Sequence, residues 1–479
     1  MAKKRAKSML SSYSIIMLLI IGLGILSHLL PNATFVGEEI VNGSGTVGAT
    51  LSQILKAPIL GFENAVDVAI FIMILGGFLK VIDKTKALET GIKVLVQKLK
   101  GKELWLIPIL MFIFSVCGTT YGMLEETVGF YVLLAATMFA AGMDPLVGSA
   151  VILLGAGSGV LGSTINPFAT GVALSALPKG LSANHGLVIF IAVVLWLTTY
   201  AICTAFVLAY ARKVKNDKGS TILSLREQQK AEKAFSKFAS DSKAEAKLTG
   251  KQKATLCLFA LTFIIMIIGF IPWGSFGVTM PSFTAILTGN PLGDWYFYDS
   301  ALWFLLIAIL IAIVNNFGEK GFVDIFVDGA DDMIGVILII AIARGASVLM
   351  STTHLDNYII YNAAELLKGM PAILYAPLNY ILHIVLSILV PSSSGIAALS
   401  TPIMAPLTQT LGFSVETNIM ILVAANGLVN LITPTCGAIM GGLELAKVEY
   451  TTWFKWAFKV VLCLALMSII VLTFFMCIL

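Results

Sequence analysis

Long apolar runs dominate the chain and alternate with short polar segments. A membrane-spanning helix takes about 20 residues, and nine windows of that kind occur, near residues 11–30, 64–82, 145–162, 186–211, 254–273, 299–316, 333–350, 416–433 and 456–478. Of the 479 residues, 58% are apolar and only 12% are charged, whereas soluble domains carry about a quarter charged residues. The pattern therefore predicts an all-α, multi-pass membrane protein. Because the first apolar run is long and no small-residue cleavage site follows it, we expect a retained helix rather than a signal peptide.

Lysine and arginine predict the orientation of these helices, because cytoplasmic loops are enriched in both. Residues 84–102 hold six lysines and residues 212–253 hold twelve lysines and arginines, whereas residues 31–63 and 178–185 hold one lysine each and residues 275–300 none. We therefore expect the N-terminus and the central basic segment on the cytoplasmic side. The acidic run after residue 316 falls on the same side and departs from this trend.

Comparison of the chain with itself reveals an internal repeat. Residues 74–101 align with residues 342–369, and both stretches end in a glycine after a lysine. "CGTTYGMLEET" then aligns with "VPSSSGIAALS", which places Gly122 on Gly395, and "GSTINPFATG" aligns with "NLITPTCGAI", which places Pro167 on Pro434. These matches occur in the same order along the chain, which indicates duplication.

The predicted orientation makes this repeat inverted. We divide the chain into a first transmembrane half, residues 1–213, a charged cytoplasmic linker, residues 214–253, and a second transmembrane half, residues 254–479. The window at 64–82 should run inward and its counterpart at 333–350 outward. Inverted repeats with interrupted helices are typical of secondary transporters, whose substrate site lies between the halves near the bilayer midplane. The linker itself predicts a solvated helix or a disordered connector.

Each half contains a hairpin tip followed by a broken helix. The predicted tips are residues 117–127 and 390–401, and the predicted broken helices are residues 145–177 and 416–440. Non-helical backbone at membrane depth is tolerated only where it is buried in protein or lines a wet cavity. We therefore expect two re-entrant hairpins and two unwound points that meet in one cavity, with scaffold helices around them.

Polar residues at these four breaks are the candidate ligands. We expect substrate contacts from Thr119, Thr120, Gly122, Glu125, Glu126, Asn166, Ser392, Ser393, Ser394, Gly395, Asn430, Thr433 and Thr435. Proline frees a carbonyl one turn earlier, so unwound backbone can coordinate a cation, and helix N-termini favour anionic groups. A candidate ion or carbonyl site comprises Ser163, Thr164, Pro167, Thr170 and Pro434. The hydroxyls at the tips can instead be helix caps.

These motifs resemble those of a known transporter family. "GTTYGMLEET", "GAGSGVLGSTINPFATG" and "PSSSGIAALSTPIMAPL" are similar to the YfcC-type branch of the anaerobic C4-dicarboxylate carrier-like family, within the ion transporter superfamily. The resemblance covers nearly the whole chain. It implies a scaffold domain, a mobile transport domain that moves like an elevator, a homodimer, and a bacterial cytoplasmic membrane. The branch includes arginine/ornithine exchangers and proteins described as dicarboxylate carriers, so it implies the class of protein more firmly than the substrate.

The charged residues distinguish these substrates. Neither the tips nor the breaks contain lysine or arginine, and Arg344 is expected on the lipid side of the scaffold, so two carboxylates of a substrate would lack a counter-charge. Glu125 and Glu126 lie one turn after a tip, where a carboxylate is costly unless it is paired. A basic substrate would pair with one of them. Alternatively, either glutamate couples transport to protons or sodium, caps backbone donors, or pairs with Arg344 or Lys80.

The sequence thus predicts a secondary transporter of arginine/ornithine type, with a C4-dicarboxylate carrier as the alternative. Exchange needs no coupling ion, whereas symport would need sodium or protons. The partners expected are a small-molecule substrate and the lipid bilayer, and a net charge of +4 suggests no nucleic acid. We expect no cofactor, because the four histidines are scattered and no nucleophile–base pair of an enzyme is visible. "GSGVLG" at residues 157–162 satisfies a nucleotide-binding pattern, yet close helix packing explains it better.

Overall fold

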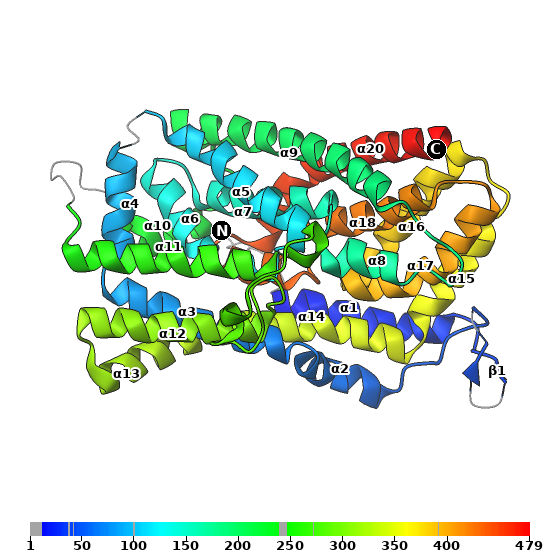
Figure 1. Cartoon of the computed structure of the whole chain (residues 1–479), viewed down its shortest axis with the longest axis horizontal. Coiled ribbons are helices and arrows are strands. Elements are labelled where there is room, and N and C mark those ends of the chain that lie inside the picture. The colour runs from blue at the N-terminus through cyan, green and yellow to red at the C-terminus, as the bar shows by residue number, and fades with distance from the viewer. Residues whose placement is uncertain are drawn as a thin grey trace, which may run out of the picture.

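A computed structural model describes residues 12–36, 39–41, 43–98, 101–238, 247–271, 273–390 and 392–479. It confirms the all-helical prediction, with a single two-stranded antiparallel sheet, β1 (Phe35–Val36) and β2 (Glu39–Ile40), among these residues. Every apolar window that the sequence predicts contains a helix. Most of these helices run along the long axis of the molecule (Figure 1).

The first half begins with four helices that precede the first tip. Their bounds are α1 (Ser12–Leu29), α2 (Leu51–Glu63), α3 (Val66–Lys84) and α4 (Ala87–Lys98). α2 and α3 are bent by 57° at a two-residue break and together are apolar enough to count as one membrane span. The remaining elements of this half are η1 (Glu103–Trp105), α5 (Leu106–Tyr121), η2 (Glu125–Phe130), α6 (Tyr131–Ala140), α7 (Pro145–Leu161), η3 (Pro167–Gly171), α8 (Val172–Ser175) and α9 (His185–Asn216).

The second half is also mostly helical. Its bounds are α11 (Gly250–Phe270), η6 (Trp273–Phe276), η7 (Ser282–Ala285), α12 (Phe297–Asn315), α13 (Gly318–Asp331), α14 (Ile334–Thr352), α15 (Leu355–Leu367), α16 (Ala372–Leu389), α17 (Ser393–Thr410), α18 (Val415–Val429), α19 (Gly437–Leu445) and α20 (Tyr450–Ile478). Within the described residues, seven helices are long and apolar enough to cross a membrane, or eight if the bent pair is one span.

Helix contacts in the two halves are reciprocal, as an internal repeat predicts. α2 packs against α14, and α13 packs against α3. Both crossings depend on glycine: a Cβ on Gly61 would lie 2.2 Å from the Ala341 carbonyl oxygen, and one on Gly329 would lie 2.5 Å from the Gly76 carbonyl oxygen. Since the two glycines occupy corresponding positions in α2 and α13, the same close approach is built twice.

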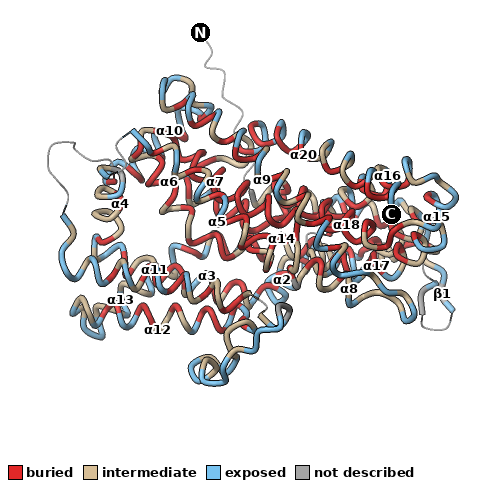
Figure 2. Tube along the Cα trace, turned by 45° about the horizontal axis from the view of Figure 1, so that its top comes forward, coloured by how far each residue is buried: buried red, intermediate tan, exposed pale blue. Residues whose placement is uncertain are grey.

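α7 and α18 form the centre of the molecule. Nearly all of their side chains are buried, and the two helices pack against each other (Figure 2). Gly427 on α18 permits this contact, because a Cβ there would lie 2.4 Å from the Cα of Leu161. α9 and α20 then cover this pair, as 32- and 29-residue helices. The ends of α7 and α18 are where the predicted breaks lie.

The sequence predicted the tips and breaks at the correct places. α5 ends at Tyr121 and α16 at Leu389, directly at the predicted tips, while α7 ends at Leu161 and α18 at Val429, at the predicted breaks. The first arm of each predicted hairpin, residues 103–121 and 372–389, is itself long enough to span a membrane. The re-entrant course of both hairpins and the bounds of the two halves remain predictions.

The linker is more ordered than the sequence predicted. It contains η4 (Lys218–Ser220), α10 (Leu225–Phe235) and η5 (Ser236–Phe238), and Glu227, Ala231, Phe235 and Phe238 in this segment are buried. α10 and η5 pack on α6, and η5 also contacts α4. The expectation of a solvated helix holds for most positions of α10, which are exposed, but Glu227, Ala231 and Phe235 form a buried face that the sequence did not predict. Residues 239–246 lie outside the described part.

Candidate functional site

The two tips and the two breaks meet in a single pocket with a cavity volume of about 110 Å³. Its lining comes from segments far apart in the sequence: the first tip, the first break, the start of α12, α14, the second tip and the second break. The lining residues are Gly122, Leu124, Glu125, Glu126, Val160, Asn166, Phe168, Tyr296, Phe297, Ile340, Arg344, Ser392, Ser393, Ser394, Asn430, Thr435, Cys436 and Gly437.

Gly122 forms the turn of the first tip. It ends α5 in the left-handed region, with φ at +79°, a conformation that glycine adopts without steric cost. A Cβ at this position would also lie only 2.6 Å from Nδ2 of Asn166. The chain then passes Leu124 and enters η2, whose first two residues are Glu125 and Glu126. Both the turn and the close packing on the break therefore require glycine.

The first break is held to the first tip by hydrogen bonds. Thr119 Oγ1 donates to the carbonyl oxygen of Gly162 at 2.6 Å, and Thr164 N donates to the carbonyl oxygen of Thr119 at 2.9 Å. Within the break, Asn166 Nδ2 donates to Ser163 Oγ at 3.0 Å, and Asn166 Oδ1 accepts from Phe168 N at 2.9 Å. These bonds satisfy backbone and side-chain groups that the interrupted helix leaves open.

The second tip and break are joined by side chains. Ser392 caps α17 by accepting from the backbone nitrogen of Gly395 at 3.1 Å, and Ser393 Oγ donates to Asn426 Oδ1 at 2.6 Å. Asn430 Nδ2 donates to the same Asn426 oxygen at 3.1 Å. The N-termini of α17 and α19 both line the pocket, and the partial positive charge of a helix N-terminus favours anionic groups.

Three charged side chains line the pocket: Glu125, Glu126 and Arg344. Arg344 Nη2 lies 3.8 Å from Glu125 Oε1, with the two side chains 32% and 26% exposed. Glu126 is buried and accepts a hydrogen bond from the backbone nitrogen of Leu124 at 3.1 Å. Among the described residues, no ion pair involves Glu126. At full ionisation the lining therefore carries a net charge of −1, since one arginine faces two glutamates.

Aromatic side chains form another part of the lining. Phe168 follows the first break, and Tyr296 and Phe297 stand at the start of α12. The rings of Phe168 and Tyr296 are 5.8 Å apart between centroids. A planar cation such as a guanidinium interacts favourably with aromatic faces, so the pocket combines carboxylates with surfaces on which such a group can stack.

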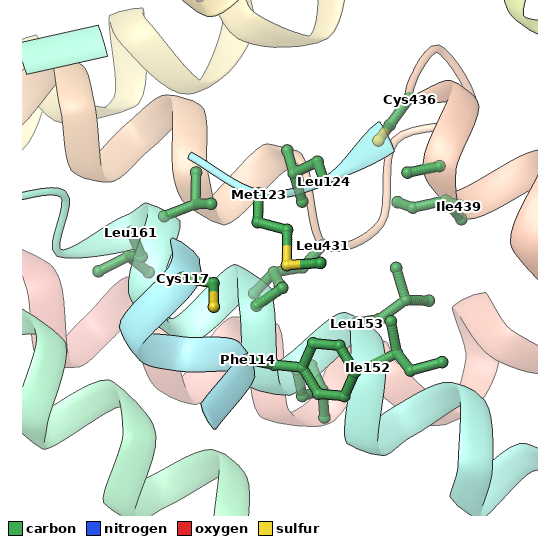
Figure 3. Close-up of a cluster of buried hydrophobic side chains, with 14 of the residues drawn as sticks. Phe114, Cys117, Met123, Leu124, Ile152, Leu153, Leu161, Leu431, Cys436 and Ile439 are labelled. Carbon is green, nitrogen blue, oxygen red and sulfur yellow. The ribbon is translucent and has the colours of Figure 1, made fainter. Parts of the chain in front are cut away.

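Beneath the first tip lies a cluster of buried apolar side chains (Figure 3). Met123 and Leu124 from the tip, Leu161 from α7, and Leu431 and Cys436 from the second break belong to the same core. This packing joins side chains of the first tip to side chains of the second break. The polar lining therefore stands on a close-packed apolar base, which fixes the position of the tip.

Half of the candidate residues line the pocket, and the other half lie in the adjoining tips and breaks. The lining includes Gly122, Glu125, Glu126, Asn166, Ser392, Ser393, Ser394, Asn430 and Thr435. Thr119, Ser163, Thr164 and Thr170 donate to backbone carbonyls of the first tip and break. Thr120 bonds within its own helix, Thr433 bonds Thr435, and Gly395 donates to its cap. The remaining two, Pro167 and Pro434, lie in the breaks.

The expectation for Arg344 was wrong. The sequence placed it on the lipid side of the scaffold, whereas in the structure it lines the pocket beside Glu125. Its helix, α14, is apolar on every side, so periodicity does not identify the inward face. A signal was nevertheless present, because an ionisable residue inside a membrane almost always faces the protein interior or a wet cavity. The pairing with Glu125 was among the alternatives left open. The sequence also did not indicate that Tyr296, Phe168 and Cys436 line the pocket.

The sequence profile of the C4-dicarboxylate anaerobic carrier family matches residues 9–477. The chain belongs to this family. Membership in the C4-dicarboxylate anaerobic carrier family makes it a transporter rather than an enzyme, and its apolar helices make it a multi-pass membrane protein. Within the described residues, no three His, Cys, Asp or Glu side chains gather in a way that could hold a metal ion.

Individual relatives include two curated proteins. An uncharacterised protein of Haemophilus influenzae is 30% identical over 423 residues, which is 88% of this chain and 78% of the relative. The Escherichia coli protein YfcC, named provisionally as a basic amino acid antiporter, is 24% identical over 405 residues, which is 82% of this chain and 74% of the relative.

Two transporters are among the solved structures that align with this chain. The YdaH transporter of Alcanivorax borkumensis aligns with a TM-score of 0.44 at 14% identity and covers 97% of both chains. MtrF of Neisseria gonorrhoeae, described with a class of antimetabolite efflux pumps, aligns with a TM-score of 0.43 at 16% identity, over 99% of this chain and 96% of that one.

Proposed function

We propose that this protein exchanges basic amino acids of the arginine/ornithine type across the membrane. The observation that carries the proposal is the charge of the pocket lining, where one arginine stands beside two glutamates. A basic amino acid has one carboxylate and two cationic groups, so it is the charge complement of that set. Glu126 strengthens the proposal, because a buried carboxylate without a cationic partner is costly and a substrate cation would supply one.

The alternative substrate is a C4-dicarboxylate. The description of the family, Arg344, and the two helix N-termini at the pocket support it. Against it, two substrate carboxylates would meet a lining with more negative than positive charge. A dicarboxylate carrier would therefore need sodium ions or protons to compensate the glutamates, whereas an exchanger of basic amino acids would need no coupling ion.

We further propose an alternating-access mechanism of the elevator type, in a homodimer, in a bacterial cytoplasmic membrane with the N-terminus inside. The hydrogen bonds between the first tip and the first break support a moving unit that contains both. The sites proposed above for a coupling ion, at Ser163, Thr164, Pro167, Thr170 and Pro434, are secondary to this scheme, since exchange resets the carrier without one.

Uptake by reconstituted protein tests the substrate. Proteoliposomes loaded with ornithine should take up labelled arginine, and vesicles without internal ornithine should take up much less. The same uptake should occur with and without sodium. Uptake of labelled succinate or malate instead, with arginine excluded, would overturn the proposal and support the dicarboxylate alternative.

A further inference from the structure

The two opposite charges nearest each other in the pocket come from different halves of the chain. Glu125 opens η2 in the first half, and Arg344 lies on α14 in the second. Their 3.8 Å separation exceeds a hydrogen-bond distance of about 2.7–3.2 Å. Both side chains are partly exposed toward the pocket. Within the described part of the chain neither side chain makes a hydrogen bond, so the pair is held by charge and the hydrogen-bonding groups of both are available to a ligand.

The surroundings of Arg344 suit a carboxylate. The N-terminus of α19 lies against α14 one turn before Arg344, because Gly437 packs so closely on Ile340 that a Cβ there would lie 2.3 Å from Ile340 Cγ1. Cys436 and Gly437, at this N-terminus, line the pocket together with Arg344. A guanidinium fork and a helix N-terminus on the same wall both favour a bound anion.

We propose that Arg344 and Glu125 together recognise the head group of an α-amino acid, with Arg344 binding the α-carboxylate and Glu125 the α-ammonium. This assignment rests on the proposed function and adds the position of each substrate group to it. In an amino acid the two groups are attached to one carbon, so an adjacent arginine and glutamate match them. A dicarboxylate in the same place would put its second carboxylate beside Glu125.

Glu126 has a separate role in this arrangement. It is 3% exposed and is oriented by the backbone nitrogen of Leu124, whereas Glu125 faces Arg344. Glu126 is thus the carboxylate left for the cationic side chain of the substrate. Bound substrate would replace the contact between Glu125 and Arg344 with two contacts of its own, and it would connect η2 of the first half with α14 of the second.

Three related ligands test the carboxylate contact of Arg344 and the ammonium contact of Glu125 separately. Arginine has both head-group charges, agmatine lacks the carboxylate, and 5-guanidinopentanoic acid lacks the α-amino group. Each would compete with labelled arginine for binding to the full chain in detergent. The wild-type protein should prefer arginine over both analogues by about tenfold or more, as a charge-assisted contact worth about 1.4 kcal/mol or more requires.

Substitutions should remove these preferences one at a time. Arg344→Gln should lose the preference for arginine over agmatine and keep the preference over 5-guanidinopentanoic acid. Glu125→Gln should do the reverse. Arg212→Gln and Glu319→Gln are matched controls, because both side chains are exposed and lie away from the pocket, and both should behave as wild type. If Arg344→Gln does not fold, Arg344→Lys should selectively reduce the arginine-over-agmatine preference, since an ammonium cannot form the fork.

A uniform effect would overturn the inference. If either pocket substitution weakens the binding of all three ligands by the same factor, Arg344 and Glu125 maintain the shape of the pocket and do not contact the head group of the substrate. Failure of the proposed function gives a different result: the protein would exclude arginine but bind another α-amino acid, and the same comparison would be made with that amino acid and its decarboxylated and deaminated analogues. Binding of dicarboxylates alone would overturn both.

Discussion

Thr164 donates two hydrogen bonds to the carbonyl oxygen of Thr119, from its backbone nitrogen at 2.9 Å and from Oγ1 at 3.0 Å. Thr119 returns a bond from its own Oγ1 to the carbonyl oxygen of Gly162 at 2.6 Å. These residues lie at the end of α5 and just after the end of α7, so the first tip and the first broken helix are tied where each leaves helical geometry. Movement of one segment would therefore carry the other.

Replacing Thr119 with valine should weaken this connection without changing the volume of the side chain. The carbonyl of Gly162 would lose its buried donor, which costs about 1–3 kcal/mol. We expect a lower melting temperature in detergent and a several-fold slower exchange of arginine for ornithine. Thr119→Ser, which keeps the hydroxyl, should retain most of the thermal stability and most of the exchange rate. Equal behaviour of the two variants would mean that the hydroxyl does not contribute.

Gly122→Ala should be damaging for two reasons that a control can separate. Its φ of +79° disfavours any side chain by roughly 1–2 kcal/mol, and its new Cβ would collide with Asn166 at 2.6 Å. Gly142→Ala carries nearly the same backbone strain, at φ +84°, but meets nothing within 4 Å. We expect Gly142→Ala to lose some stability and keep transport, and Gly122→Ala to lose transport as well. Similar transport by both variants would show that contact with Asn166 is unimportant.

The breaks could be predicted from the sequence because their causes are local. Gly122 supplies a left-handed turn at the first tip, and Pro167 and Pro434 lie at the two breaks. The glycine turn is not repeated, because Gly395, the counterpart of Gly122, lies in the first turn of α17 and has no positive φ. That reasoning placed the ends of α5, α7, α16 and α18 within a few residues. Part of the pocket lining was predictable for the same reason, since all of its polar residues except Tyr296 and Arg344 come from the tips and breaks.

The role of Arg344 could not be predicted in this way. α14 is apolar around its whole circumference, so the direction of one arginine depends on its packing against α2 and α19. Tyr296 was missed for a related reason, because it follows a long irregular segment whose course depends on tertiary contacts. The buried face of α10 was not predicted, because the linker as a whole is highly charged. In each case the information lies in contacts between segments distant in the sequence.

Glu126→Gln should change which amino acids are bound. In the proposed arrangement its carboxylate compensates the cationic side chain of the substrate, and the amide would keep the size of the side chain but remove the charge. We expect arginine to lose at least about tenfold in affinity, as the loss of one charged contact implies. Citrulline, which replaces the guanidinium with a neutral ureido group, should lose little affinity. If the affinities for arginine and citrulline fall by the same factor, Glu126 supports the tip through Leu124 and does not contact the side chain of the substrate.

Glu227 connects the linker to the last helix. Its buried carboxylate accepts from the backbone nitrogen of Glu449 at 2.8 Å, from Thr452 Oγ1 at 3.1 Å and from the backbone nitrogen of Ser224 at 2.7 Å. Glu449 precedes α20, so a carboxylate from the linker caps the N-terminus of that helix. A negative charge is favourable at this end of a helix, and the linker is thereby fixed to the C-terminal part of the fold.

Removing this carboxylate should destabilise the protein more than its place in a charged linker suggests. Glu227→Ala would remove the acceptor of three partly buried hydrogen bonds, at a cost of about 1–3 kcal/mol. Glu227→Gln should fall between alanine and wild type, because its single oxygen can replace only part of the carboxylate. Glu232→Ala is the matched control, since Glu232 is exposed on the same helix. Thermal unfolding in detergent should rank the variants in that order, and equal melting temperatures for Glu227→Ala and Glu232→Ala would mean that the cap contributes nothing to stability.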